Sequence, residues 1–236
     1  MGRKTGMLMG LAILMMLAGC SRNRAVTPFN GKDLTGWLTK EEGKKKSKWM
    51  VGVAAVSSED PKLLVARKGS GEMINAPGRF GEGLDLYSAG KFGDCRIELE
   101  LMIPKGSNSG IYVMGEYEIQ VFDSWGKEKM ESVDMGAIYG AASPPFNACG
   151  KPGEWQSYAI EFQAPRFDAQ DRKTANAKFL KVELNGKAIH RNLEMPGPTP
   201  GGVTGKEAPE GPIMFQGNHG PVAYRNIRIT SLSLAK

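Results

Sequence analysis

The sequence predicts an all-β fold, a two-sheet antiparallel β-sandwich or jelly roll. Glycine accounts for 31 and proline for 14 of the 236 residues, a glycine share of about 13 per cent where roughly 7 per cent is usual. These residues divide the chain into short segments. Several segments alternate apolar and polar side chains with a period of two, which is typical of half-buried strands. No long amphipathic helix pattern lies between them, and this excludes an alternating helix and strand arrangement.

The clearest predicted strand is residues 95–103, where five apolar side chains alternate with three charged residues and one methionine. Pro104 and Gly106 end it. Residues 111–114 and 117–122 then predict a hairpin around Gly115 and Glu116. Further strands are predicted at residues 155–162, 179–184, 188–190, 213–216 and 223–230, with an Asn185-Gly186 turn joining the second and third of these.

Three segments are predicted to be irregular. Residues 166–177 are polar enough for a loop or a short surface helix. Residues 194–212 are rich in proline and glycine and predict a long loop that could border a site. The lysines at 44, 45, 46 and 48 predict a solvated loop.

The first nineteen residues predict export. Arg3 and Lys4 precede an apolar run at residues 7–17, and small residues stand immediately before Cys20. This run is about half as long as a membrane-spanning helix requires. We therefore expect residues 1–19 to be a signal peptide, residues 20–28 a linker and residues 29–236 one folded domain.

The residues Leu-Ala-Gly-Cys at 17–20 resemble the lipobox of bacterial lipoproteins. This resemblance implies that Cys20 carries the lipid. The expected location is a bacterial membrane, with the outer membrane facing the periplasm or the cell surface as the favoured one.

Charge and cysteine content exclude two classes of function. The formal net charge is +6, but no basic face with interleaved aromatic residues is apparent, so a nucleic-acid partner is not expected. Cys95 and Cys149 remain once Cys20 is lipidated. An oxidising compartment allows them to pair, while the position of Cys95 in phase with apolar strand residues fits a buried free thiol equally well. A catalytic cysteine is disfavoured, because neither has a histidine nearby in sequence.

Several catalytic motifs are absent from the sequence. No Gly-x-Gly-x-x-Gly or Walker-type loop occurs, so nucleotide chemistry has no support. Residues 106–110 resemble a nucleophile elbow, but the central residue is Asn108 and not serine. Zinc is weakly supported by two distant histidines. The carboxylates of Glu118 and Asp123 instead suggest a divalent metal such as calcium, with Asp123 as its candidate ligand.

The best candidate site begins in residues 117–123. Alternation sends Ile119 and Val121 to one face of the strand and Glu118 and Gln120 to the other. Adjacent polar side chains on a sheet can bind a sugar, although they can also simply face water. Asn108 and Ser109 precede the neighbouring strand, and three further polar residues, Gln216, Asn218 and His219, end another. His219 by itself fits a loop histidine that is hydrogen-bonded among glycines.

Seven short motifs resemble those of the 3-keto-disaccharide hydrolase domain family. They are FNGKDLTGW at 29–37, SNSGIY at 107–112, YEIQ at 117–120, GEW at 153–155, LNG at 184–186, GPIMFQGNH at 211–219 and RNI at 225–227. The resemblance implies a concanavalin A-like, LamG-like β-sandwich on an exported lipoprotein that cleaves glycosides oxidised at C3. Two departures concern substrate preference more than the fold. Gly217 and Asn218 stand where members often have aspartate before the histidine, and Gln156 stands where asparagine is common.

The resemblance implies an elimination. A ketone at C3 acidifies the proton on C2, a base removes it, the enolate expels the group at C1, and water then adds. Glu118 or His219 is the expected base. The oxyanion and the ring are expected to contact Asn108, Gln120 and a metal near Asp123. Tyr112 and Trp155 are expected to form apolar walls. Further expected substrate contacts are Ser109, Tyr139 and Gln216. A sugar 3-dehydrogenase is the partner expected to supply the oxidised sugar.

Two other functions fit the same residues. Glu118 and a second carboxylic acid could hydrolyse an unoxidised glycosidic bond directly. A carbohydrate-binding lipoprotein could also use such a sandwich without any turnover, because a fold does not determine a function.

Overall fold

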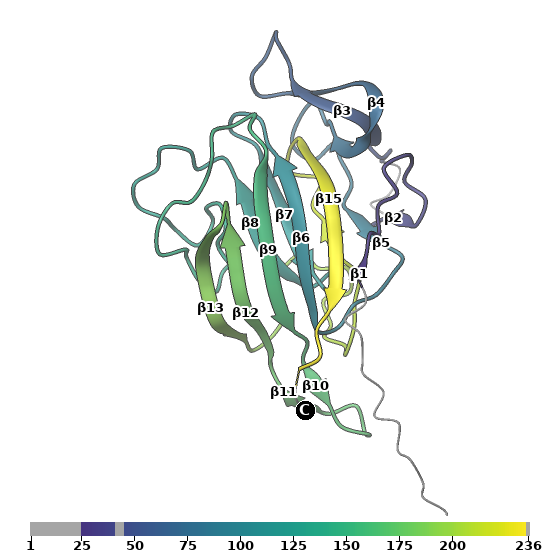
Figure 1. Ribbon diagram of the computed structural model, residues 1–236, viewed down its shortest axis with the longest axis vertical. Coiled ribbons are helices and arrows are strands. Elements are labelled where there is room, and N and C mark those ends of the chain that lie inside the picture. Colours follow the sequence, from purple (N-terminus) through teal and green to yellow (C-terminus); the bar gives the residue numbers. More distant parts are fainter. Residues whose placement is uncertain (1–24, 41–44, 235–236) are drawn as a thin grey trace, which may run out of the picture.

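The computed structural model describes residues 25–40 and 45–234, which form two antiparallel β-sheets packed face to face (Figure 1). The described residues contain no helix, and thus none that could cross a membrane. This confirms the predicted all-β sandwich. The signal segment, Cys20 and the first linker residues lie outside the described residues, and so does Lys44.

The larger sheet has eight strands. Seven follow one another in the order β13 (Lys187–Met195), β12 (Ala177–Leu184), β9 (Gln156–Gln163), β6 (Cys95–Met102), β15 (Val222–Ser231), β4 (Leu64–Asn75) and β3 (Trp49–Val56). The short strand β1 (Ala25–Val26) also pairs with β15. A separate hairpin of β10 (Arg166–Phe167) and β11 (Lys173–Ala175) extends from one end of the sandwich (Figure 1).

The smaller sheet has five strands in the order β2 (Trp37–Thr39), β5 (Leu86–Ser88), β14 (Met214–Phe215), β7 (Asn108–Val113) and β8 (Tyr117–Phe122). In the view of Figure 1, β7 and β8 lie behind the larger sheet. Segments that are far apart in sequence are thereby brought side by side, because β14 pairs with both β5 and β7.

Apolar side chains from both sheets form the core between them. Tyr117 of β8 packs on Phe162 of β9, with ring centroids 5.2 Å apart, and Phe215 of β14 stacks on Tyr224 of β15 at 3.8 Å. These contacts join one sheet to the other. Burying such rings removes large apolar areas from water, which stabilises the sandwich.

Most predicted strands are present, with bounds shifted by a few residues, and residues 117–122 have the predicted bounds. Residues 166–177, expected to be a loop or a short surface helix, instead contain the β10–β11 hairpin. Cys95 and Cys149 are both buried free thiols. Burial raises the pKa of Cys95 to about 12, so this thiol is unreactive near neutral pH.

Candidate active site

One face of the β7–β8 hairpin carries the polar side chains. Tyr112 pairs with Glu118, and Gly110 pairs with Gln120. Because alternate residues of a strand share a face, these four residues and Asn108 face away from the core, on the outer side of the smaller sheet. The intervening residues Ile111, Val113, Ile119 and Val121 belong to the core.

This face forms the floor of a pocket of about 200 Å³, which we call the Glu118 pocket. Most of its lining residues are those expected from the sequence. The lining comprises Asn108, Tyr112, Glu118, Gln120, Tyr139, Pro200, Gly201, Gln216 and His219. The pocket gathers carboxyl, imidazole, phenol and amide groups in a small volume, which suits a ligand with many hydroxyl groups.

Glu118 is the carboxylic acid of the pocket lining among the described residues. Its side chain is buried, with 3% of the residue exposed, and this desolvation raises its pKa to about 7. The Tyr112 hydroxyl opposes the rise through a hydrogen bond, and the charge of Asp85 adds to it. A carboxyl with a pKa near the ambient pH is well suited to accept and return a proton.

Gly110 provides the space for the Glu118 carboxyl group. A Cβ built at Gly110 would overlap Glu118 Oε1 and approach the carboxyl carbon at 3.1 Å. The backbone of Gly110 is also held by the neighbouring strand β14, because the Gly110 carbonyl accepts the amide of Gln216 at 2.9 Å.

Gly110→Ala should therefore lower kcat/KM by about tenfold or more while the fold persists, since the added methyl group displaces the carboxylate and small displacements of a catalytic group are costly. Steady-state kinetics with circular dichroism on the same sample would measure this. Gly197→Ala is a matched control, because a Cβ at Gly197 would meet nothing within 4 Å and this residue lies outside the pocket. Equal kcat/KM for Gly110→Ala and the wild type would contradict the placement of Glu118.

Amide side chains surround the carboxyl group. Gln120 Nε2 donates to Asn108 Oδ1 at 2.8 Å, which orients both amides. Gln216 is 8% exposed, and its Oε1 has no hydrogen-bond partner among the described residues. A buried acceptor without a partner is costly, so a donor from a ligand would stabilise this side of the pocket.

His219 lies on a turn after β14. Its Nδ1 and Asn218 Oδ1 form a very short hydrogen bond, and its ring meets the edge of Phe80 with centroids 4.8 Å apart. His219 is therefore held at the rim of the pocket by polar and aromatic contacts. The pocket thus contains a second side chain, besides Glu118, that can exchange a proton.

A strap, residues 199–205, crosses over the end of the hairpin. Thr199 Oγ1 accepts the Glu118 amide at 2.9 Å. The buried carboxylate of Glu116 accepts the amides of Thr204 at 2.8 Å and Gly205 at 2.9 Å. Lys40 Nζ donates to the carbonyls of residues 201 and 202 at 2.9 and 2.8 Å. The long loop predicted to border a site thus does so, and these contacts fix it in place.

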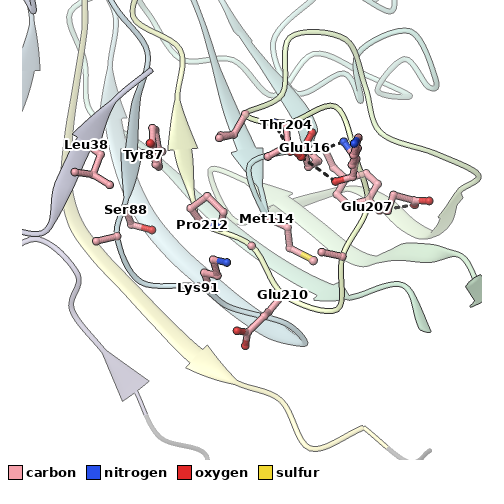
Figure 2. A pocket seen from close by; sticks show the side chains of 16 residues that line it. Leu38, Tyr87, Ser88, Lys91, Met114, Glu116, Thr204, Glu207, Glu210 and Pro212 are labelled. Atoms are coloured by element: carbon pink, nitrogen blue, oxygen red, sulfur yellow. Dashed lines mark hydrogen bonds between the residues drawn. The ribbon is translucent and has the colours of Figure 1, made fainter. Parts of the chain in front are cut away.

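Beyond the strap lies a second hollow of about 260 Å³ (Figure 2). Leu38, Tyr87, Met114 and Pro212 supply apolar surface to it, and Lys91 and Glu210 stand at its edge. A sugar needs convergent polar groups, and a catalytic acid or base is expected to have a perturbed pKa. Both are found in the Glu118 pocket, which we therefore take as the candidate active site.

A covering segment, residues 134–142, shields the outer edge of β8 and brings Tyr139 into the pocket. The Gln120 amide donates to the carbonyl of Ala137 at 2.8 Å, and the Tyr139 amide donates to the carbonyl of Glu118 at 3.1 Å. Backbone hydrogen bonds therefore place Tyr139 beside Glu118.

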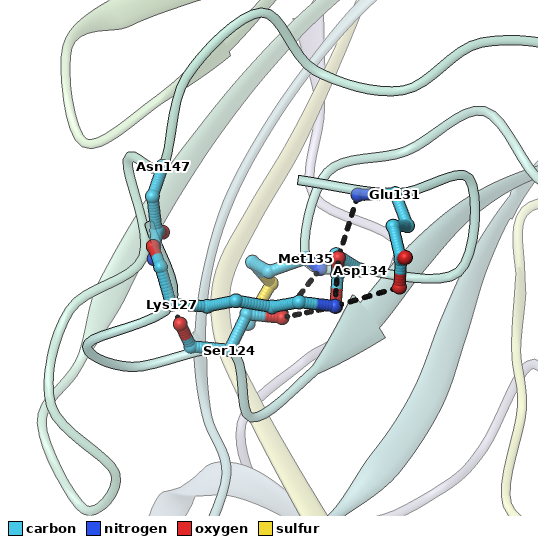
Figure 3. Close-up of polar contacts among 6 residues, drawn as sticks. All are labelled: Ser124, Lys127, Glu131, Asp134, Met135 and Asn147. Atoms are coloured by element: carbon cyan, nitrogen blue, oxygen red, sulfur yellow. Dashed lines mark hydrogen bonds and ion pairs between the residues drawn. The ribbon is translucent and has the colours of Figure 1, made fainter. Parts of the chain in front are cut away.

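A polar cluster anchors the start of the covering segment (Figure 3). Lys127 Nζ contacts Asp134 Oδ2 at 2.7 Å and Glu131 Oε2 at 2.9 Å. Ser124 Oγ donates to Asp134 Oδ1 at 3.2 Å and accepts the amide of Met135 at 3.0 Å. Because Asp134 is 1% exposed, loss of one of these partners would leave a buried charge poorly compensated.

Three expected site residues lie elsewhere. Ser109 faces the core, where its Oγ donates to the carbonyl of Gln216 at 2.7 Å, because neighbours in a strand face opposite sides and Asn108 faces the pocket. Trp155 packs against a small cluster on the outer face of the larger sheet, and the Arg225 guanidinium lies 4.0 Å from its ring centroid. It therefore forms no wall of the Glu118 pocket.

Asp123 follows the end of β8 and binds backbone amides. Its Oδ2 accepts the Gly106 amide at 2.8 Å, and its Oδ1 accepts the Trp125 amide at 3.3 Å. No group of three or more histidine, cysteine, aspartate or glutamate side chains that could hold a metal ion occurs at residues 25–40 and 45–234. The residues around Asp123 do not fit the expected metal site, and we derive no step through a metal.

The sequence analysis missed three residues of this region. Pro200 and Gly201 line the pocket from the strap, and the buried carboxylate of Asp85 accepts the Gly217 amide at 2.9 Å. The prediction that residues 194–212 border a site was the available signal for the first two. No local pattern pointed to Asp85, because the pairing of β5 with β14 brings it there.

Comparison with known proteins agrees with this fold. A protein of Bacteroides thetaiotaomicron named 3-keto-disaccharide hydrolase is 30% identical over 170 residues, which are 70% of this chain and 54% of that protein. The chain thus spans about half the length of this curated relative. A crystal structure from Parabacteroides distasonis ATCC 8503, provisionally named a glycosyl hydrolase, matches with a TM-score of 0.64 and 28% identity over 88% of this chain and 84% of that chain. A second structure from that organism has a TM-score of 0.59 at 19% identity, covers 89% of this chain and 94% of its own, and shares the fold. Residues 24–230 match the family described as the 3-keto-alpha-glucoside-1,2-lyase-like domain, and the chain therefore belongs to that family.

Proposed function

We propose that this protein cleaves the glycosidic bond of 3-keto-glycosides or 3-keto-disaccharides by elimination followed by hydration. Family membership and the hydrolase relative support action on carbohydrate. One observation carries the finer proposal, namely a buried glutamate with a pKa near 7 in a polar pocket of about 200 Å³. That volume suits a single sugar ring, and the presence of Glu118 in the lining supports its assignment as the base.

The first half of the reaction removes a proton and expels the leaving group. The Glu118 carboxylate takes the proton from C2, and the electron pair of that bond forms an enolate whose negative charge rests on the C3 oxygen. The C3 carbonyl then re-forms, and the electron pair between C2 and C3 moves to form a double bond between C1 and C2. The bond from C1 to the leaving oxygen breaks as this happens. The leaving oxygen takes a proton from His219.

The second half restores both groups. Water adds its oxygen to C1 and gives a proton to His219, while Glu118 returns its proton to C2. The net change is hydrolysis with the carboxylate regenerated. Asn108, Gln120 and Tyr139 carry neutral donors for the enolate oxygen, and donors that are already oriented stabilise such a charge without reorganisation.

Activity should rise with pH through about 7. Glu118 must be ionised to accept the C2 proton, and its pKa is raised to about 7, so kcat/KM should fall about tenfold per pH unit below that value. A pH series of initial rates on one 3-keto-glucoside would measure this. A flat profile between pH 5 and pH 8 would rule out Glu118 as the base.

The proposal is tested by incubating the purified protein with matched glucosides and their 3-keto derivatives, with and without EDTA, and following release of the aglycone. Turnover of the keto forms alone is expected. Turnover of plain glycosides would replace the proposal with direct hydrolysis by two carboxylates, and saturable binding without turnover would replace it with a binding module. Loss of turnover in EDTA would add a metal.

We further propose that the lipid on Cys20 holds the domain at a bacterial membrane, with the outer membrane favoured, and that an enzyme oxidising sugars at C3 supplies the substrate. The lipobox-like residues 17–20 support the first point, and the need for a C3 ketone supports the second. Recovery of the wild type in the membrane fraction and of Cys20→Ala in the soluble fraction would test the anchor.

A further inference from the structure

We propose that Asp85 is a positioning residue of the Glu118 pocket, whose buried carboxylate fixes the turn that carries His219 and acts on Glu118 from the same face of the smaller sheet, two strands from Gly110. The inference rests on the proposed function in that it assigns Asp85 a part in the same site. It concerns a residue outside the pocket lining.

Sheet register puts Asp85 on the same face as the pocket. Leu86 pairs with Phe215, and Phe215 pairs with Ile111. Extending this register by one residue sets Asp85 beside Gln216, which in turn lies beside Gly110. Since neighbouring strands are about 4.8 Å apart, Asp85 lies two strands from Gly110. The Glu118 carboxyl group lies over Gly110, where the missing side chain leaves space.

Asp85 and Asn75 hold the turn at residues 217–220 through its backbone amides and carbonyls. Asp85 Oδ1 accepts the Gly217 amide at 2.9 Å. Asn75 Nδ2 donates to the carbonyls of Gly217 at 2.8 Å and Gly220 at 2.9 Å. Asn75 is fully buried and Asp85 is 4% exposed. A side chain at Gly217 would overlap the carbonyl of Leu84, so the turn has no room to shift toward β5.

Burial is the main cause of the raised pKa values of Glu118 and Tyr112, two residues of the pocket floor, and the charge of Asp85 adds to both. The other titratable groups around Glu118 are Tyr112, Tyr139 and His219 in the pocket and Tyr224 in the core. The pocket lining includes no lysine or arginine among the described residues. Lys40 approaches from the strap, where its Nζ donates to the carbonyl of Gly201 at 2.9 Å.

The test replaces Asp85 with asparagine, which keeps an acceptor for the Gly217 amide and removes the charge. The Glu118 carboxyl signal is followed by ¹³C NMR as a function of pH in protein labelled at glutamate Cδ, and the signal is assigned by its loss in Glu118→Gln. We expect Asp85→Asn to lower the midpoint by about half a pH unit, since Asp85 is the smallest of the contributions to the raised pKa of Glu118, and to shift the acid limb of kcat/KM by the same amount. Asp168→Asn is the matched control, because Asp168 also accepts backbone amides but lies on the β10–β11 hairpin, outside the pocket.

The two readouts separate this inference from the proposed function. A lowered midpoint without any turnover of 3-keto-glycosides would support Asp85 and overturn the proposed function. Turnover with equal midpoints in the wild type, Asp85→Asn and Asp168→Asn would overturn the role of Asp85. Should Asp85→Asn not fold, Asp85→Ser serves in the same titration, and an unchanged midpoint there would also overturn it.

Discussion

Replacing Glu118 with glutamine should lower kcat on a 3-keto-glucoside by roughly 10²- to 10⁴-fold, the usual contribution of a general base. Glutamine keeps the size of the side chain but cannot accept the C2 proton. Binding of the keto sugar should be largely retained, because the amides of Asn108, Gln120 and Gln216 remain in place. Single-turnover kinetics with a separate binding measurement would distinguish the loss of chemistry from a loss of affinity.

The control for this variant is Glu128→Gln, which removes a carboxylate from an exposed position outside the pocket. Its kcat should equal that of the wild type. If Glu118→Gln also turned over at the wild-type rate, Glu118 would not be the base, and His219 would take its place as the next candidate to test.

The same substitution should stabilise the protein at high pH. Glu118 has a folded pKa of about 7 against an ordinary value of 4.5, so the folded state binds this proton more tightly than the unfolded state. The corresponding stability is fully present below pH 4.5 and is lost as pH rises through about 7. The neutral amide of Glu118→Gln avoids this loss, which amounts to about 3 kcal/mol.

The measurement is chemical or thermal unfolding of wild type and Glu118→Gln at several pH values. The difference in the free energy of unfolding should grow between pH 4.5 and pH 7 and level off above it. Glu128→Gln should show no such trend. A constant difference between the wild type and Glu118→Gln across this range would mean that burial does not raise the pKa of Glu118. Ionisation of Glu118 would then not lower the free energy of unfolding.

Periodicity predicted the regular strands and failed where the pattern is interrupted. In β6 and β8 every second side chain is apolar and buried, so the alternation is visible in the sequence. Strand β4 was missed because its middle, with Gly69 and Gly71, is polar and exposed. The β10–β11 hairpin was missed because its short strands bury little apolar surface.

The site was predictable where its residues share a local pattern. Glu118 and Gln120 alternate with core residues, and Asn108 faces the same side from β7. Asn108 and Ser109 could not both face the ligand, since adjacent strand residues point to opposite faces. Asp85 could not be placed, because only the pairing of strands more than a hundred residues apart brings it near Gln216. Long-range register of this kind is not encoded in any local pattern.

The covering segment at residues 134–142 has a consequence for solubility. Strand β8 is the last strand of its sheet, and an uncovered last strand offers its amides and carbonyls to any other extended chain, which is a common start of aggregation. The hydrogen bonds of Ala137 and Tyr139 occupy these groups on β8. Sequence changes that loosen the contacts between Lys127 and Asp134 would thus expose an aggregation-prone edge of β8 and also disturb the pocket.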